Sequence, residues 1–178
     1  MCDLLKKSAL AYQKLSACQY TLLCGKKGVL TQVIIRFPVD AYHHLAGFQY
    51  ARIAALRERK TALQVILAGD VTHQQLMSSG FQHEDRLRCL ISLSECLEAN
   101  RFVFRYNGHE HPGSSIKADY LMQFEDAVFF TCKEVPVSIF SSPAMDYGRN
   151  CPRMTVLEIR RLCLETGNEE VVYQRTQK

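Results

Sequence analysis

The spacing of apolar residues along the first half of the chain predicts helices around one β-hairpin. Residues 2–17 place apolar side chains three and four positions apart, which is the period of an amphipathic helix. Two β-rich runs follow at 19–24 and 29–37, and the GKKG sequence at 25–28 between them is typical of a hairpin turn. The chain therefore begins with a helix that leads directly into an antiparallel pair.

Further helices are predicted between this hairpin and position 100. Pro38 ends the second strand, Asp40 suits the N-cap of the next helix, and Thr72 suits the N-cap of a later one. The predicted helices span residues 41–56, 59–67, 72–79 and 83–100. The last of them has the clearest amphipathic pattern in the chain.

The remainder of the chain changes to short β-rich runs that Gly, Pro, Asp and Ser separate. The predicted strands span 101–107, 115–124, 127–132, 137–140, 154–159 and 170–174, and residues 154–164 also fit a helix. Helices that gather first and strands that gather later indicate an α+β fold. We expect one domain over residues 1–178, in which N-terminal helices and a β-hairpin pack on a C-terminal antiparallel sheet.

Composition fits that expectation. A chain of 178 residues with 47% hydrophobic and 22% charged residues is large enough to bury most of its apolar surface without a metal or a disulfide. No apolar run reaches the length of a membrane span, and the first residues lack the apolar core of a signal peptide. We therefore expect a soluble cytoplasmic protein. A net charge of +4 permits a nucleic-acid partner without requiring one.

The eight cysteines carry no zinc-site or CxxC spacing. Several lie in apolar runs, as Cys132 does in AVFFTC, where cysteine behaves as a small hydrophobic residue. We expect all eight to be reduced thiols.

Two adjacent histidines are the first candidates for chemistry. His43 and His44 lie in the sequence YHHLAGFQY, where successive helical residues point about 100° apart, so one of them at most faces a given cleft. Histidine is the usual general acid or base near neutral pH. The alternative is a hydrogen-bonded core histidine beside a solvent-facing one. Gly47 would allow a neighbouring element to pack closely here.

Arg86 continues an apolar helix stripe at its N-terminal end. Spacings of four, three and four place it in line with Leu90, Leu93 and Leu97. Its guanidinium either extends past the edge of the core into solvent or points into a cleft and holds a phosphate.

Strand alternation separates the side chains of SSIKADYLM. Ile116, Ala118, Tyr120 and Met122 would share the core face, which leaves Lys117 and Asp119 on the other face. These two charges either form a surface pair of little energetic consequence or supply a phosphate contact and an orienting group for a histidine.

Two weaker patterns remain. His109 and His111 flank Glu110 in a loop and allow a metal site, although no third ligand has recognisable spacing. The basic run 51–60 either faces RNA or is a solvated helix surface. No nucleotide-binding loop, HExxH motif or GxSxG motif is present.

Taken in order, HHLAGFQY, RLRCLISLSECL and SSIKADYL resemble the fourth family of phage-associated nucleases grouped with barnase, EndoU, the tRNase colicins and RelE. The resemblance covers roughly residues 5–140. It implies helices packed on an antiparallel sheet, and a phage or mobile-element protein that cleaves RNA without a metal ion or other cofactor.

The resemblance also implies site residues. The catalytic set that it implies is His44, Arg86, Lys117, Asp119 and Tyr120. The residues that we expect to contact substrate are His43, Arg52, Lys60 and Ser115. The His43–His44 doublet leaves the active histidine open by one position, and Ser94 stands where the family pattern has a glutamate.

The expected function is a metal-independent endoribonuclease, and the resemblance implies that its action is toxin-like. A histidine would take or give the proton, Arg86 and Lys117 would stabilise the phosphate, and Asp119 or Tyr120 would assist. The product would be a 2′,3′-cyclic phosphate. RNA, and an antitoxin or immunity protein, are the expected partners. The competing interpretations are a non-catalytic protein-binding module, such as a mobile-element inhibitor of a host factor, and a metal-dependent hydrolase that uses His109 and His111.

Overall fold

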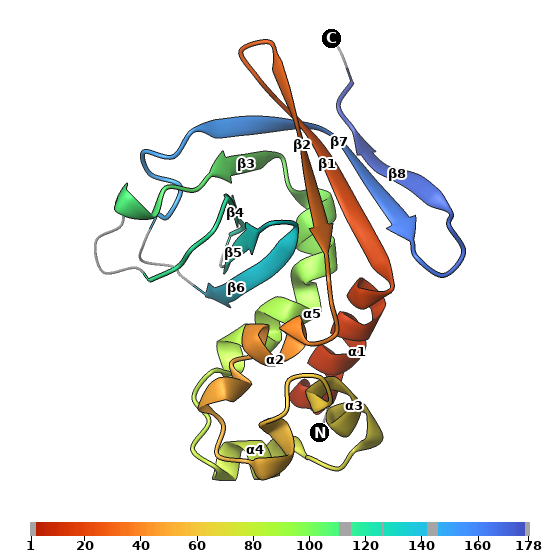
Figure 1. The fold of residues 1–178 in the computed structure, drawn as a ribbon, viewed down its shortest axis with the longest axis vertical. Coiled ribbons are helices and arrows are strands. Elements are labelled where there is room, and N and C mark those ends of the chain that lie inside the picture. The colour runs from red at the N-terminus through yellow and green to blue at the C-terminus, as the bar shows by residue number, and fades with distance from the viewer. Residues whose placement is uncertain (1–2, 111–114, 126, 142–145, 177–178) are drawn as a thin grey trace.

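A computed structural model of the chain describes residues 3–110, 115–125, 127–141 and 146–176. Its strands form one antiparallel sheet, and its helices gather on one face and at one end of that sheet (Figure 1). The strands are β1 Cys18–Lys26, β2 Val29–Arg36, β3 Phe102–Arg105, β4 Tyr120–Gln123, β5 Ala127–Cys132, β6 Val135–Ser141, β7 Arg153–Cys163 and β8 Glu169–Gln174. The α-helices are α1 Leu4–Ser16, α2 Ala41–Leu45, α3 Ala62–Ala68, α4 His73–Ser78 and α5 Glu84–Ala99. The 3₁₀ turns are η1 Phe48–Tyr50, η2 Ala54–Leu56 and η3 Gly108–Glu110.

The sheet runs β2-β1-β7-β3-β4-β5-β6, and β8 pairs with β7. The predicted meander is present from β3 to β6, but β7 crosses to lie between β3 and the first hairpin. The sheet also curls, which brings the end of β2 to the β5–β6 turn. There the Arg36 amide donates to the Glu134 carbonyl at 2.8 Å, and the side chains of these two residues form an ion pair of 2.9 Å. The outer strands β2 and β6 thus approach each other.

Two apolar clusters hold the fold together. In the larger cluster the buried faces of α1 and α5, which include Tyr12 and Leu93, pack on the sheet with β1, β2 and β7. The smaller cluster, centred on Phe130, lies on β4 and β5 and includes Tyr106 and Leu121. Burial of these aromatic and aliphatic side chains is the main stabilising contribution to the fold.

The α+β class and most elements are confirmed. Asp3 and Thr72 cap α1 and α4 through their side chains, and Thr72 forms a full capping box with Gln75. Leu90, Leu93 and Leu97 are fully buried, and Arg86 is half-buried at the end of their stripe. None of the described helices combines the length and apolar character that a membrane crossing requires. The seven described cysteines are free thiols.

Two predictions about local structure were wrong. The helix predicted over 41–56 stops at Leu45, because Gly47 adopts a left-handed φ of 82° and the chain continues as two 3₁₀ turns. The strand predicted over 115–124 begins only at Tyr120. Ile116 and Ala118 therefore pack with the smaller cluster, while Tyr120 packs with the larger one.

The strand predicted over residues 154–159 is confirmed, and the helical alternative for residues 154–164 is excluded. They form most of β7, the longest strand of the sheet.

Candidate active site

The start of α5 and the short helix α2 meet beside strand β6. The Asp85 carboxylate on α5 accepts a hydrogen bond of 3.2 Å from the Ser141 amide at the end of β6. From the next residue along, Arg86 Nη1 donates at 3.5 Å to the Leu45 carbonyl of α2, and its guanidinium carbon lies 5.7 Å from the centre of the Phe140 ring. These contacts fix Arg86 between α2 and β6.

The turn at Gly47 allows this close approach. A Cβ atom added at Gly47 would lie 3.2 Å from both Arg86 Cδ and His83 Cβ, and the backbone there has a positive φ. Both the space and the conformation therefore favour glycine at this position. The predicted role of Gly47 in close packing is confirmed, and the packing partner is α5.

His44 lies in the electrostatic field of Arg86. Its side chain is exposed overall, but neighbouring atoms cover part of the imidazole. This partial burial is the largest cause that lowers the pKa of His44, followed by the positive charges of Arg86 and Arg59, while a backbone hydrogen bond to Val137 acts in the opposite direction. The lowered pKa favours a neutral imidazole at pH 7, which is the form that can accept a proton.

His43 has a different environment from its neighbour. It is 4% exposed, and its ring lies 6.2 Å from the ring of Phe48 in the core. Burial lowers its pKa, which the nearby Leu56 backbone offsets in part, but neither ring nitrogen makes a hydrogen bond of normal geometry. The structure therefore places His43 in the core and His44 at the surface.

The segment that contains Lys117, Asp119 and Tyr120 lies at the turn between β5 and β6. Asp119 Oδ2 accepts a hydrogen bond of 2.8 Å from the Lys133 amide in that turn. Lys117 is exposed, and Tyr120 is half-buried at the start of β4. Among the described residues, no hydrogen bond, ion pair or ring contact joins any of these three to His44 or Arg86.

Three of the residues expected to contact substrate make no described contact with His44. Arg52, Lys60 and Ser115 are exposed, and the described hydrogen bonds and ion pairs link none of them to that histidine. In the metal alternative, His109 is exposed in η3 and His111 lies outside the described residues. No group of three or more potential ligands gathers in the part of the chain that the structure describes.

The sequence patterns did not single out Tyr50 and His83, whose rings pack together beside Gly47. Tyr50 is 59% exposed, and its ring centre lies 4.7 Å from that of His83, which itself packs against Gly47. Arg59 also went unassigned, although it belongs to the basic run 51–60. No sequence signal beyond residue type marks Tyr50 and His83, because their proximity depends on the break in helix 41–56.

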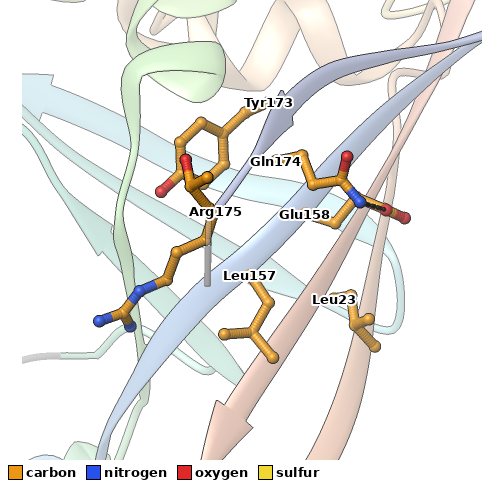
Figure 2. Close-up of a pocket in the computed structure, with 7 residues that line it drawn as sticks. Leu23, Leu157, Glu158, Tyr173, Gln174 and Arg175 are labelled. Atoms are coloured by element: carbon orange, nitrogen blue, oxygen red, sulfur yellow. Dashed lines mark hydrogen bonds between the residues drawn. The ribbon is translucent and has the colours of Figure 1, made fainter. Parts of the chain in front are cut away.

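A broad surface hollow lies on another part of the molecule. An open hollow of about 1000 Å³ is lined by Leu23 of β1, by Leu157 and Glu158 of β7, and by residues at the end of β8 (Figure 2). Its described lining includes none of the predicted catalytic residues.

The sequence model of one protein family, described as phage-Barnase-EndoU-ColicinE5/D-RelE like nuclease4, matches residues 4–144. This range includes every predicted catalytic residue and ends before β7. The N-terminal helix and curled antiparallel sheet are consistent with a barnase-like nuclease fold. No curated protein and no solved structure matches the chain.

Proposed function

The chain belongs to this family of phage-associated nucleases, and on that premise we propose that it is a metal-independent endoribonuclease with His44 as its general base. The observation that carries the proposal is the meeting of an exposed histidine of lowered pKa with a half-buried arginine between α2, α5 and β6. A proton acceptor beside a fixed cation is the minimum that phosphodiester cleavage by an internal hydroxyl requires.

The proposed reaction uses the RNA as its own nucleophile. The neutral His44 imidazole removes the proton of a 2′-OH, and the 2′-oxygen attacks the adjacent phosphorus. The bond to the 5′-oxygen breaks, that oxygen takes up a proton, and the products are a 2′,3′-cyclic phosphate and a 5′-hydroxyl. General base catalysis of this kind contributes roughly 10²- to 10⁴-fold in rate.

Arg86 would stabilise the charge that develops on the phosphate. Its guanidinium is held by the Leu45 carbonyl and the Phe140 ring, so it is ordered before substrate binds. A preorganised donor of this type contributes about 3 kcal/mol to the transition state. Lys117 and Tyr120 remain the candidates for a second cation and for the proton donor to the leaving oxygen, and Asp119 remains a candidate for orienting a catalytic group.

Tyr50 would bind a nucleobase next to the reacting phosphate. One side of its ring packs on His83, while most of the side chain is open to solvent. Because His83 and Arg86 both pack against Gly47, a base stacked on Tyr50 would lie near the phosphate held by Arg86. Stacking on an aromatic side chain recognises single-stranded RNA with little sequence preference.

Cleavage of a mixed RNA pool in the presence of EDTA tests the proposal. The wild-type chain should produce fragments that end in a 2′,3′-cyclic phosphate, and His44→Ala should cleave roughly 10²- to 10⁴-fold more slowly while keeping the fold, because the side chain is exposed. His109→Ala, which changes another exposed histidine, is the matched control and should cleave like the wild type. Cleavage that requires an added metal ion, or that His44→Ala retains at the wild-type rate, would exclude this mechanism.

A second candidate function is a protein-binding module, and one observation favours it. Val29 and Leu30 at the tip of the β1–β2 hairpin are 65% and 63% exposed, beside Lys26 and Lys27. Exposed apolar residues next to basic ones are common in protein interfaces. Intact RNA from the wild-type chain, together with binding of an inhibitor or host protein that Leu30→Ser abolishes, would favour this function over nuclease activity.

A further inference from the structure

Cys18 and Cys163 face each other across two neighbouring strands. Cys18 begins β1, Cys163 ends β7, and the antiparallel register pairs them directly. In Figure 1 the start of β1 lies beside the end of β7. Both are half-buried free thiols, and neither belongs to the proposed nuclease site. Directly paired residues project from the same face of a sheet, so the two thiols lie on one side.

Residues that face each other on antiparallel strands form either hydrogen-bonded or non-hydrogen-bonded pairs. The Leu164 amide donates to the Ala17 carbonyl at 2.9 Å, so residues 17 and 164 are a hydrogen-bonded pair. The Cys163 amide points the other way and donates to the Asn168 carbonyl at 2.8 Å. Because the two kinds of pair alternate along an antiparallel ladder, Cys18 and Cys163 are a non-hydrogen-bonded pair.

This geometry suits a disulfide. The Cα atoms of a non-hydrogen-bonded pair lie about 4.5 Å apart, inside the range of roughly 4.4–6.8 Å that a disulfide spans. We propose that Cys18 and Cys163 are a thiol modification site, which a low-molecular-weight disulfide such as oxidised glutathione converts into a cross-strand disulfide. The register supplies the alignment, so no rearrangement of the sheet is needed.

The two thiols differ in pKa, and this difference determines which of them reacts first. Hydrogen bonds from the side chain and backbone of Thr166 and from the Glu165 backbone lower the pKa of Cys163. Burial raises the pKa of Cys18, and the charge of Arg161 offsets this in part. Cys163 is therefore the first nucleophile, because the thiolate is the form that reacts.

The exchange proceeds in two balanced steps. The Cys163 thiolate attacks one sulfur of oxidised glutathione, which forms a mixed disulfide and releases one glutathione thiolate. Cys18 then loses its proton and attacks the Cys163 sulfur, and a second glutathione thiolate leaves. Overall, two protein thiols are oxidised to one disulfide, and one oxidised glutathione is reduced to two glutathione molecules.

The bond would connect the end of α1 to the β7–β8 hairpin. Most of the chain lies between the two cysteines, so the crosslink would strongly restrict the unfolded state. The expected rise in Tm is on the order of 10 °C, from the loop-closure effect of a long loop and the usual dependence of Tm on stability. The proposed nuclease activity should not change, because neither cysteine belongs to the proposed site.

Incubation of the reduced full chain with oxidised glutathione tests this inference. Intact-mass analysis and peptide mapping should find a Cys18–Cys163 disulfide in the wild type, together with the rise in Tm. Cys18→Ser should stop at a glutathione adduct on Cys163, and Cys163→Ser should form neither product. The matched control is Cys96→Ser, because Cys96 is also half-buried but lies on α5. This variant should behave as the wild type.

Three outcomes would overturn the inference. They are a wild-type chain that stays reduced, one that stops at glutathione adducts, and one that links other cysteines. Each can be read from the peptide map whether or not the chain cleaves RNA, so this test and that of the nuclease proposal fail independently.

Discussion

Two regions of the molecule supply the predicted catalytic residues, and these regions differ in the contacts that their side chains make. Around His44 and Arg86, the elements α2, α5 and β6 converge from distant parts of the sequence. Arg86 donates a hydrogen bond to Leu45, contacts the Phe140 ring and, in addition to burial, lowers the pKa of His44 through its charge. Around Lys117 and Asp119, the described contact of the carboxylate is with the Lys133 amide in a tight turn. The same kind of motif evidence pointed to both regions, and only long-range packing distinguishes them.

The two regions therefore differ in what their side chains can do. The α2–α5–β6 region has the composition of a reacting centre, with a proton acceptor, a cation and an exposed aromatic ring. The Lys117–Tyr120 segment connects the start of β4 to the β5–β6 turn, where the Asp119 carboxylate accepts a hydrogen bond from the Lys133 amide.

The largest expected effect beyond His44 itself is at Arg86. Arg86→Ala should lower the rate of RNA cleavage by roughly 10²-fold, because the transition state loses a preorganised donor that contributes about 3 kcal/mol. Arg86→Lys should recover only part of that loss, since a single ammonium group cannot reproduce the planar fork. Single-turnover cleavage rates measure both variants.

Arg88 is the matched control for Arg86. It is an exposed arginine two residues further along the same helix, so Arg88→Ala changes the net charge equally. A loss as large in Arg88→Ala as in Arg86→Ala would indicate general electrostatic attraction of RNA and would remove Arg86 from the reacting centre.

A smaller effect is expected at Tyr50. Tyr50→Ala should raise KM for a short single-stranded RNA by about 10-fold with little change in kcat, since stacking of one base contributes ~1–3 kcal/mol. Tyr50→Phe should keep the wild-type KM, and Phe102→Ala, at another exposed aromatic residue, should have no effect. A fall in kcat with an unchanged KM would contradict the stacking role.

Asp119 should affect stability more than cleavage. Asp119→Ala should lower the free energy of unfolding by about 1 kcal/mol, because the Lys133 amide loses its acceptor, and Asp119→Asn should retain most of the stability. Urea unfolding and cleavage rates separate the two effects. If Asp119→Asn folds normally but loses cleavage more than about 10-fold, the carboxylate acts in the reaction and the contrast between the regions fails.

The smallest effect is expected at His43, and it depends on pH. Burial holds the pKa of His43 below its unfolded value of about 6.5, so the unfolded chain binds a proton first as the pH falls. His43 therefore lowers the free energy of unfolding below about pH 6.5 and has no such effect above it.

His43→Leu should reduce this acid-side loss and leave stability at pH 7.5 unchanged or slightly higher, since no hydrogen bond is removed. Urea unfolding at pH 5.5 and at pH 7.5 measures the difference, and His109→Gln, at an exposed histidine, serves as control. A strong loss of stability in His43→Leu at pH 7.5 would show that the imidazole has a structural partner.

Local signals in the sequence predicted most elements because their causes are local. The capping box at Thr72 and the apolar stripe that ends at Arg86 depend on residues within one or two turns of helix. The break at Gly47 was missed because glycine is tolerated within helices, and its positive φ is favoured here by the close approach of α5. The position of β7 between β1 and β3 depends on pairings between distant segments, which no local pattern encodes.

The candidate site was predictable to a similar depth. Residue type and motif order singled out His44 and Arg86, and the exposed histidine is distinguished from its buried neighbour only once α2 is placed against β6. The roles of Tyr50 and His83 required the turn at Gly47 to be known.

A double-mutant cycle on the cleavage rate tests most directly whether His44 and Arg86 form one reacting centre. His44→Ala, Arg86→Ala and the double variant would be compared with the wild type in single-turnover cleavage of one RNA in EDTA. Groups that act together on one phosphate are strongly non-additive, so the double variant should lose little more activity than His44→Ala alone. Losses that multiply in full, or an Arg86→Ala variant that cleaves at the wild-type rate, would contradict the account.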